Sequence, residues 1–177
     1  MLNYLNHLRK SKSVLGMNAR NIEYIMPFNH KREVRIADSK ILTKKLLRRT
    51  GLPVAETYGI IRNRKELQHF DWQNLPKSFV LKPNRGLGGT GVLLVYGKKK
   101  DRECWIKANK DTVSLEYLQN EVLAILDGDY SRVNIPDIAI FEERIKIHPA
   151  FKPYSYRGIP DTRIIVFNNI PVMAELR

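Results

Sequence analysis

The sequence predicts an α+β fold in which the sheets are mostly antiparallel. Apolar residues make up 43% of the 177 positions, which is enough to build a hydrophobic core. Short segments rich in β-branched and aromatic residues follow one another across turns, so neighbouring strands can pair antiparallel. Other segments carry apolar residues at three- and four-residue spacing, which is typical of amphipathic helices.

Helices are predicted mainly in the first half of the chain. Pro27 and Asn29 break the chain after the second of them. Asp38 and Ser39 are alternative N-caps for the third, and Gly51 and Pro53 follow its end. A further helix begins near Ser114. The first four predicted helices cover residues 3–12, 17–25, 39–50 and 65–70.

Most strands are predicted in the second half. Residues 78–82 and 92–96 suggest a hairpin with a long glycine-rich tip. Asn168 and Asn169 mark the turn of a second hairpin, formed by residues 161–167 and 171–176. The remaining predicted strands cover residues 57–61, 103–107 and 138–141.

The composition narrows the class of protein without identifying it. A formal net charge of +13 predicts attraction to an anion, and nucleic acid, an anionic membrane surface and a nucleotide all remain open. The single cysteine, Cys104, excludes an intrachain disulfide and fits a reducing, cytoplasmic location. We find no apolar run of transmembrane length and therefore expect no membrane insertion. The four histidines show no metal-ligand spacing, and no metal ligand is assigned.

The segment from Phe79 to Val92 is the most informative part of the sequence. Four glycines within six positions let the backbone approach an anion and turn its N–H groups toward it. They are Gly86, Gly88, Gly89 and Gly91. Lys82 ends the preceding strand, where one ammonium can bridge two phosphates, and Arg85 adds a second cation.

Two common nucleotide motifs do not describe this segment. No Gly-Lys-Ser/Thr follows, so it is not a P-loop, and a strand rather than a helix comes after the glycines, so it is not a dinucleotide fingerprint. A flexible hairpin tip beside a solvated lysine remains an alternative interpretation.

Three further segments, in matching order and spacing, resemble the ATP-grasp superfamily. They are Asp38-Ser39-Lys40 with the later Gly51-Leu52-Pro53-Val54-Ala55-Glu56-Thr57, Ile140-Phe141-Glu142-Glu143-Arg144-Ile145, and Asp161-Thr162-Arg163 with the hairpin that ends at Arg177. The resemblance is to the alpha-L-glutamate ligase-like branch, also described as sugar-transfer-associated. It implies an ATP-grasp fold with two α+β lobes, the second of them incomplete. The implied domains are a helical lead-in (1–37), a first lobe (38–135) and the start of a second lobe (136–177).

The resemblance also implies site residues. Lys40 and Lys82 would contact ATP phosphates, and the loop from Gly86 to Gly91 would close over them. Glu142, Glu143 and Ile145 would lie at the adenine edge. Arg163 and Arg177 would act at the γ-phosphate and the acceptor carboxylate, and Asp161 would either orient Arg163 or bind substrate. Each assignment has an alternative. The two lysines could be ordinary surface residues, and Glu142 and Glu143 could be a polar strand end. Arg163 and Arg177 could simply belong to a half-exposed hairpin.

The implied reaction is ATP-dependent joining of a carboxylate to an amine or related nucleophile through an acyl phosphate. The family's Mg²⁺ ligands follow the position of Arg177, so we expect this chain to be a fragment that lacks them. Two other functions are carried as alternatives. One is a catalytically silent nucleotide-binding relative in cell-envelope sugar chemistry, and the other is a basic nucleic-acid-binding module, which the scattered aromatics make unlikely. The oligomeric state stays open.

Overall fold

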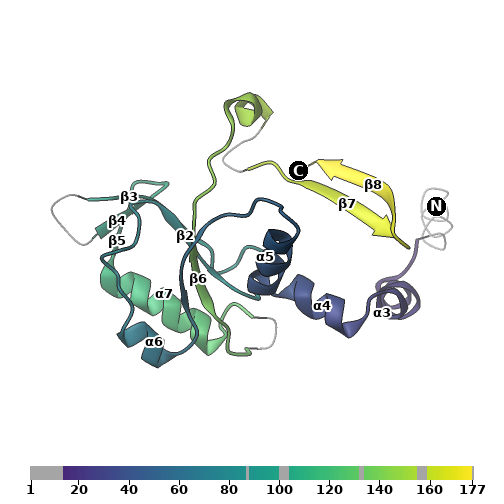
Figure 1. The fold of residues 1–177 in the computed structure, drawn as a ribbon, viewed down its shortest axis with the longest axis horizontal. Helices are drawn as coiled ribbons and strands as arrows, with labels where there is room; N and C mark the ends of the chain where they lie inside the picture. The colour runs from purple at the N-terminus through teal and green to yellow at the C-terminus, as the bar shows by residue number, and fades with distance from the viewer. Residues whose placement is uncertain (1–13, 87, 100–103, 132–133, 155–158, 177) are drawn as a thin grey trace, which may run out of the picture. The chain divides into compact units, whose positions relative to one another are not determined.

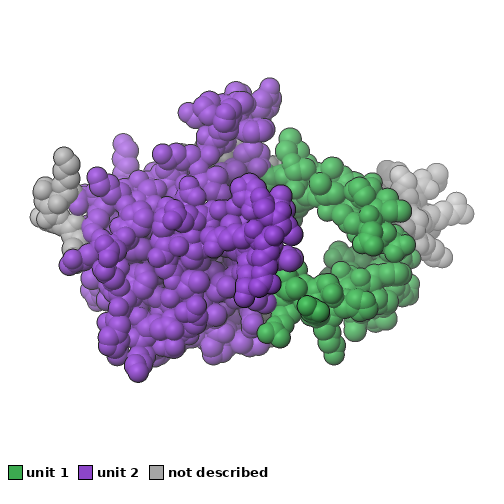
Figure 2. All heavy atoms as spheres, in the orientation of Figure 1, with its two compact units in different colours: residues 1–37, 161–177 green, residues 38–160 purple. Residues whose placement is uncertain are grey.

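The computed structural model describes residues 14–86, 88–99, 104–131, 134–154 and 159–176. These residues form two compact units, coloured separately in Figure 2. The larger unit covers residues 38–160, and the smaller one combines residues up to 37 with residues from 161 onward. The predicted helix at 3–12 lies outside the described residues.

The larger unit is built on a six-stranded antiparallel sheet (Figure 1). The strand order is β1-β6-β2-β3-β4-β5, so β6 from late in the chain pairs with both β1 and β2. The strands are β1 (Thr57–Ile61), β2 (Phe79–Pro83), β3 (Leu93–Lys98), β4 (Cys104–Lys107), β5 (Thr112–Ser114) and β6 (Ala139–Glu142).

One face of this sheet carries the hydrophobic core. Leu81 and Phe141 are opposite each other in neighbouring strands, and both are fully buried with Phe79 and Trp105. The apolar side of α7 (Leu115–Asp127) packs on them, and α6 (Arg64–Gln68) contributes Leu67. Fully burying side chains of this size stabilises the fold by about 1.5–3 kcal/mol each. The core therefore fixes β2 and β6 side by side.

A third helix, α5 (Lys40–Arg49), contributes no buried residue to that core. It begins at Ser39, whose hydroxyl accepts a hydrogen bond from the Leu42 N–H, as expected for an N-cap. Its first turn is tied to the residue that follows β2, because Ile41 N–H donates to Asn84 Oδ1 at 3.0 Å. The arrangement holds the start of α5 at the end of the lysine-bearing strand.

The smaller unit contains short helices and the second hairpin. α2 (Met17–Ala19), the π-helix η1 (Arg20–Ile25) and α3 (Met26–Phe28) follow one another, and β7 (Thr162–Phe167) pairs antiparallel with β8 (Ile170–Leu176). The rings of Tyr24 and Phe28 pack against Phe167, with centroid distances of 6.3 and 5.2 Å. α4 (Lys31–Asp38) leads from this unit into the larger one.

The α+β class and the mostly antiparallel sheets are confirmed, and several boundaries are corrected. The helix predicted at 17–25 continues to Phe28, and the chain leaves the helical conformation at Asn29, not at Pro27. Pro27 follows a π-helical turn, where the regular i→i−4 hydrogen-bond pattern that proline interrupts is already absent. Ser39, not Asp38, caps α5, since Asp38 ends α4. The sequence analysis missed α4, the three-residue β5 and the 3₁₀ helix η2 (Pro149–Tyr154).

The compact units divide the chain differently from the domain limits suggested by the sequence. Those limits place residues 136–177 in a second lobe. In the structure β6 belongs to the same sheet as β1 and β2, and the larger unit continues to Pro160.

Candidate nucleotide site

The glycine-rich segment connects β2 to β3, and its glycines have different roles. Gly88, Gly89 and Gly91 have positive φ values of 61°, 82° and 71°, which glycine adopts without strain. A Cβ on Gly91 would lie 2.5 Å from the ring of Tyr130, whereas Gly88 and Gly89 face open space. Gly86 lies so close to the Pro83 ring that a Cβ would be 2.1 Å from its Cγ. The loop is therefore closely packed at its ends and open at its tip.

Lys82 lies on the sheet face opposite the core, together with Glu142. Val80 is directly opposite Glu142 in the β2–β6 pair, and Lys82 follows Val80 by two residues on the same face. Lys82 Nζ forms an ion pair with Glu142 Oε1. Lys44 of α5 forms an ion pair with the other oxygen, Oε2, and also donates to Thr57 Oγ1 at 3.1 Å. A single buried carboxylate thus holds two lysines from different elements.

Lys40 reaches the start of the glycine loop from α5. Its Nζ donates to the carbonyl oxygens of Asn84 and Gly86 at 3.2 and 3.3 Å. Burial lowers the pKa of Lys40 from its ordinary value, and the positive charge of Lys82 lowers this pKa further. Lys40 and Lys82 therefore lie near enough for their positive charges to repel one another.

Two buried polar residues hold this arrangement in place. Asn84, only 3% exposed, accepts through Oδ1 from the Ser39 hydroxyl at 3.1 Å and from the Ile41 N–H. Asp137, 6% exposed, accepts from the backbone N–H of Arg85 at 2.6 Å. The Arg85 side chain itself is exposed. These contacts fix the backbone from which the loop departs.

Beyond Glu142 the chain leaves the sheet, with Glu143 hydrogen-bonded to Glu56 and Ile145 exposed to solvent. Glu143 N–H donates to the Glu56 carbonyl at 2.8 Å, and its side chain accepts from Glu56 N–H. The Ile145 side chain is 55% exposed. On the same face of the sheet as Lys82, Leu94 lies opposite Val80, and both Leu94 and Tyr96 remain half-exposed. Leu94 and Tyr96 therefore form a half-exposed apolar strip on this face, and the guanidinium of Arg144 lies over the Tyr96 ring, 4.3 Å from its centroid.

Asp161 and Arg163 belong to the smaller unit. Arg163 Nε lies 3.1 Å from Asp161 Oδ2, and both side chains are more than half exposed. This contact matches one of the two roles considered for Asp161, that of orienting Arg163. Arg177 lies outside the described residues.

The sequence analysis missed three residues that shape the site. Lys44 is one of several basic residues on α5, and only the fold singles it out as the partner of Glu142. Asn84 lies within the glycine motif, between Pro83 and Arg85, so a closer look at that motif could have found it. Asp137 has no sequence signal beyond its place just before a predicted strand.

No metal site is present among the described residues, where no group of three or more His, Cys, Asp or Glu side chains could hold an ion. Both oxygens of Glu142 are already engaged by lysines. These described residues do not fit a Mg²⁺ ligand set. In the same described ranges, no helix has the length and apolar character needed to cross a membrane.

Comparison with known proteins identifies the family of the chain. The family model described as sugar-transfer-associated ATP-grasp matches residues 19–177, nearly the whole chain. No curated protein and no solved structure gives a significant match. The matched range includes α5, the lysine-bearing strand, the glycine loop and the β7–β8 hairpin. The chain therefore belongs to the sugar-transfer-associated ATP-grasp family.

Proposed function

We propose that the chain binds ATP on the face of the sheet opposite the core, as part of an ATP-dependent ligase that joins a carboxylate to an amine or a related nucleophile. Membership of the ATP-grasp family supports nucleotide binding. The observation that carries the proposal furthest is that Lys40 Nζ donates to the Gly86 carbonyl at the start of the glycine loop, while Lys82 lies near the end of the strand that leads into this loop. Two cations beside a glycine-rich loop suit a triphosphate, because glycine lets backbone N–H groups approach an anion and turn toward it.

Some of the site residues would contact the phosphates of ATP, and others would contact its base. In this proposal Lys82 releases one oxygen of Glu142 and contacts the α- and β-phosphates, while Lys40 exchanges its carbonyl partners for a phosphate oxygen. The open glycines Gly88 and Gly89 let the loop tip close over the phosphates. Lys44 stays on Glu142 and keeps its charge compensated.

The base would lie against the half-exposed apolar strip of Leu94 and Tyr96. Its polar edge would meet the strand end at Glu142, Glu143 and Ile145. A flat apolar surface with a few backbone polar groups at one side suits a purine, because most of the ring buries apolar area and only its edge needs hydrogen bonds.

The proposed reaction proceeds in two balanced steps. A substrate carboxylate oxygen attacks the γ-phosphorus, the bond to the β-phosphate oxygen breaks, and ADP leaves. The amine then attacks the acyl carbonyl, expels phosphate and loses a proton. Arg163 and Arg177 would stabilise charge on the transferring phosphoryl group and the carboxylate, because a planar guanidinium binds either one through two hydrogen bonds. Asp161 would hold Arg163 in orientation.

A thermal-shift comparison tests nucleotide binding. Addition of ATP should raise the melting temperature of the wild-type chain, by mass action on the folded state, and Lys82→Ala should abolish that rise. Lys77→Ala removes an exposed lysine just before the same strand and serves as the charge-matched control. Melting without ATP reports any loss of stability from exposing Glu142. An unchanged ATP shift in Lys82→Ala would remove Lys82 from the site.

A further inference from the structure

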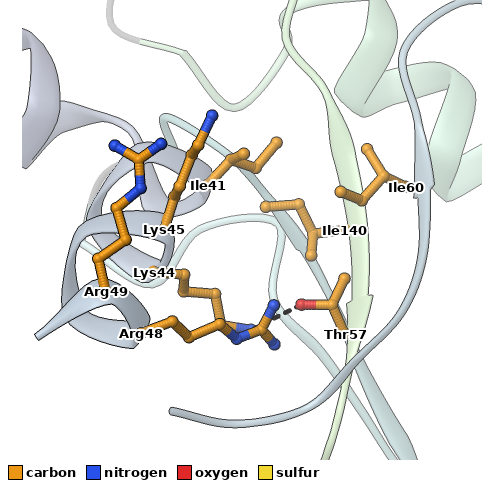
Figure 3. Close-up of a pocket in the computed structure, with 8 residues that line it drawn as sticks. All are labelled: Ile41, Lys44, Lys45, Arg48, Arg49, Thr57, Ile60 and Ile140. Carbon is orange, nitrogen blue, oxygen red and sulfur yellow. Dashed lines mark hydrogen bonds between the residues drawn. The ribbon is translucent and has the colours of Figure 1, made fainter. Parts of the chain in front are cut away.

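A cavity lies between α5 and the strands β1 and β6, and no residue of the glycine loop is among those that line it. It has a volume of about 450 Å³, within the range of small-molecule sites. Figure 3 shows the residues that line it, with the α5 side chains on one side and those of the strands on the other. The lining consists of Ile41, Lys44, Lys45, Arg48, Arg49, Thr57, Ile60 and Ile140.

The cavity is positively charged at its rim. Lys45, Arg48 and Arg49 are exposed, and none of them forms an ion pair with any residue in the described part of the chain. Lys44 is compensated by Glu142, and that carboxylate is already shared with Lys82. No acidic residue lines the cavity. Three uncompensated cations around one opening favour an anion there.

The floor of the same cavity is apolar. Ile60 and Ile140 are cross-strand partners in the β1–β6 pair, and Ile41 faces them from α5 (Figure 3). Ile140 is almost fully buried, while Ile41 and Ile60 are partly exposed toward the cavity. An inorganic ion alone would leave this floor in contact with water. A ligand that also carries an apolar body would cover it and gain the free energy of burial.

We propose that this cavity is a second ligand site, which binds an organic anion consisting of a compact phosphate or carboxylate head and a short apolar body. The head lies between Arg48, Arg49 and Lys45, where guanidinium groups can bind it through two hydrogen bonds. The body lies on Ile41, Ile60 and Ile140. The site goes beyond the proposed nucleotide site and does not depend on it, because the cations at its rim are not those proposed to bind ATP. The two regions are neighbours: Lys44 lines the cavity and pairs with Glu142, and Ile140 of the floor is the cross-strand partner of Lys82.

Titration calorimetry with alkyl phosphates of increasing length tests whether the ligand's anionic head and its apolar body both contribute to binding. Ethyl, butyl and hexyl phosphate, all kept monomeric, should bind progressively more tightly than inorganic phosphate. Each methylene that becomes fully buried should contribute about a fourfold gain in affinity. Equal affinities for inorganic and hexyl phosphate would overturn the role of the apolar floor.

A pair of charge-matched variants tests the location. Arg48→Gln/Arg49→Gln should weaken hexyl phosphate binding at least about tenfold, whereas Lys65→Gln/Lys77→Gln should change it less than about twofold. All four positions are exposed, and an unchanged melting temperature will confirm that each variant is folded. Equal weakening in both double variants would mean that only the overall charge of the chain attracts the ligand, and the site would be rejected.

Repeating the hexyl phosphate titration with ATP present separates the two sites. We expect an unchanged affinity for hexyl phosphate at any ATP concentration. Competition between the two ligands would overturn the claim of a second site. A failure of ATP to bind at all would count against the proposed function and leave this inference standing.

Discussion

Lys44 and Glu142 are 98 positions apart in sequence and form an ion pair with side chains that are only 14% and 7% exposed. The pair links α5 to β6, the strand at the centre of the proposed nucleotide site. In the proposed ATP complex, this pair would keep Glu142 compensated while Lys82 contacts the phosphates. Breaking a buried pair from one side leaves a charge without its partner, which is more damaging than losing an exposed pair.

Replacing Lys44 with Met should therefore destabilise the fold. We expect a loss of about 1–3 kcal/mol in the free energy of unfolding, because the buried carboxylate keeps Lys82 but loses one charged donor. Urea denaturation measures this loss. Lys45→Met removes the neighbouring, exposed cation and should change stability by less than about 0.5 kcal/mol. Equal effects of the two substitutions would contradict the buried role of Lys44.

Replacing a loop glycine with alanine should lower the free energy of unfolding, and the loss should be larger where the added Cβ meets a neighbouring side chain. Gly89→Ala should cost about 1–2 kcal/mol, since alanine is strained at positive φ but meets no neighbour there. Gly91→Ala should cost about 1–3 kcal/mol more, because its Cβ would press on the Tyr130 ring. Urea denaturation of both variants checks the difference. Equal losses would show that the ring moves aside without penalty.

The pH dependence of ATP binding should report on Lys40. Its pKa in the free protein is lowered below the ordinary 10.5 by burial and by Lys82, whereas a bound phosphate favours the charged form. Binding then takes up protons, so affinity should fall as the pH rises through the lowered pKa. Lys40→Arg stays charged and should keep its affinity. The ratio of the wild-type Kd to the Lys40→Arg Kd, measured from about pH 7 to about pH 10, should increase. A constant ratio would exclude Lys40 from the phosphate site.

The sequence predicted the elements that carry the site better than it predicted how they meet. β2, the glycine loop and β6 were recognisable because local chemistry marks them: a lysine at a strand end, clustered glycines, and an apolar strand running into acids. Their pairing is set by long-range packing, with Leu81 and Phe141 side by side in the core. No local pattern indicates that β6 lies between β1 and β2.

The difference between local sequence patterns and long-range packing also explains why Lys44 and Asn84 were not predicted as site residues. Lys44 resembles its neighbours in a basic helix, and only the position of β6 beneath α5 makes it different from Lys45. α4 was missed because Val34 and Ile36 are two residues apart, which is not a helical spacing. Asn84 accepts from the Ser39 hydroxyl and the Ile41 N–H at the start of α5, which lies far before it in the sequence, so this role depends on the fold.

The position of β6 between β1 and β2 also governs the order in which this protein can fold during synthesis. β1 and β2 emerge from the ribosome long before residues 139–142. Until that segment arrives, β1 lacks its neighbour β6, and β2 is paired with β3 along one edge only. Each strand then leaves an edge open to pairing with another chain. Nascent chains that stall before Ala139 are therefore expected to be the aggregation-prone species, and chaperones would be needed most during that interval.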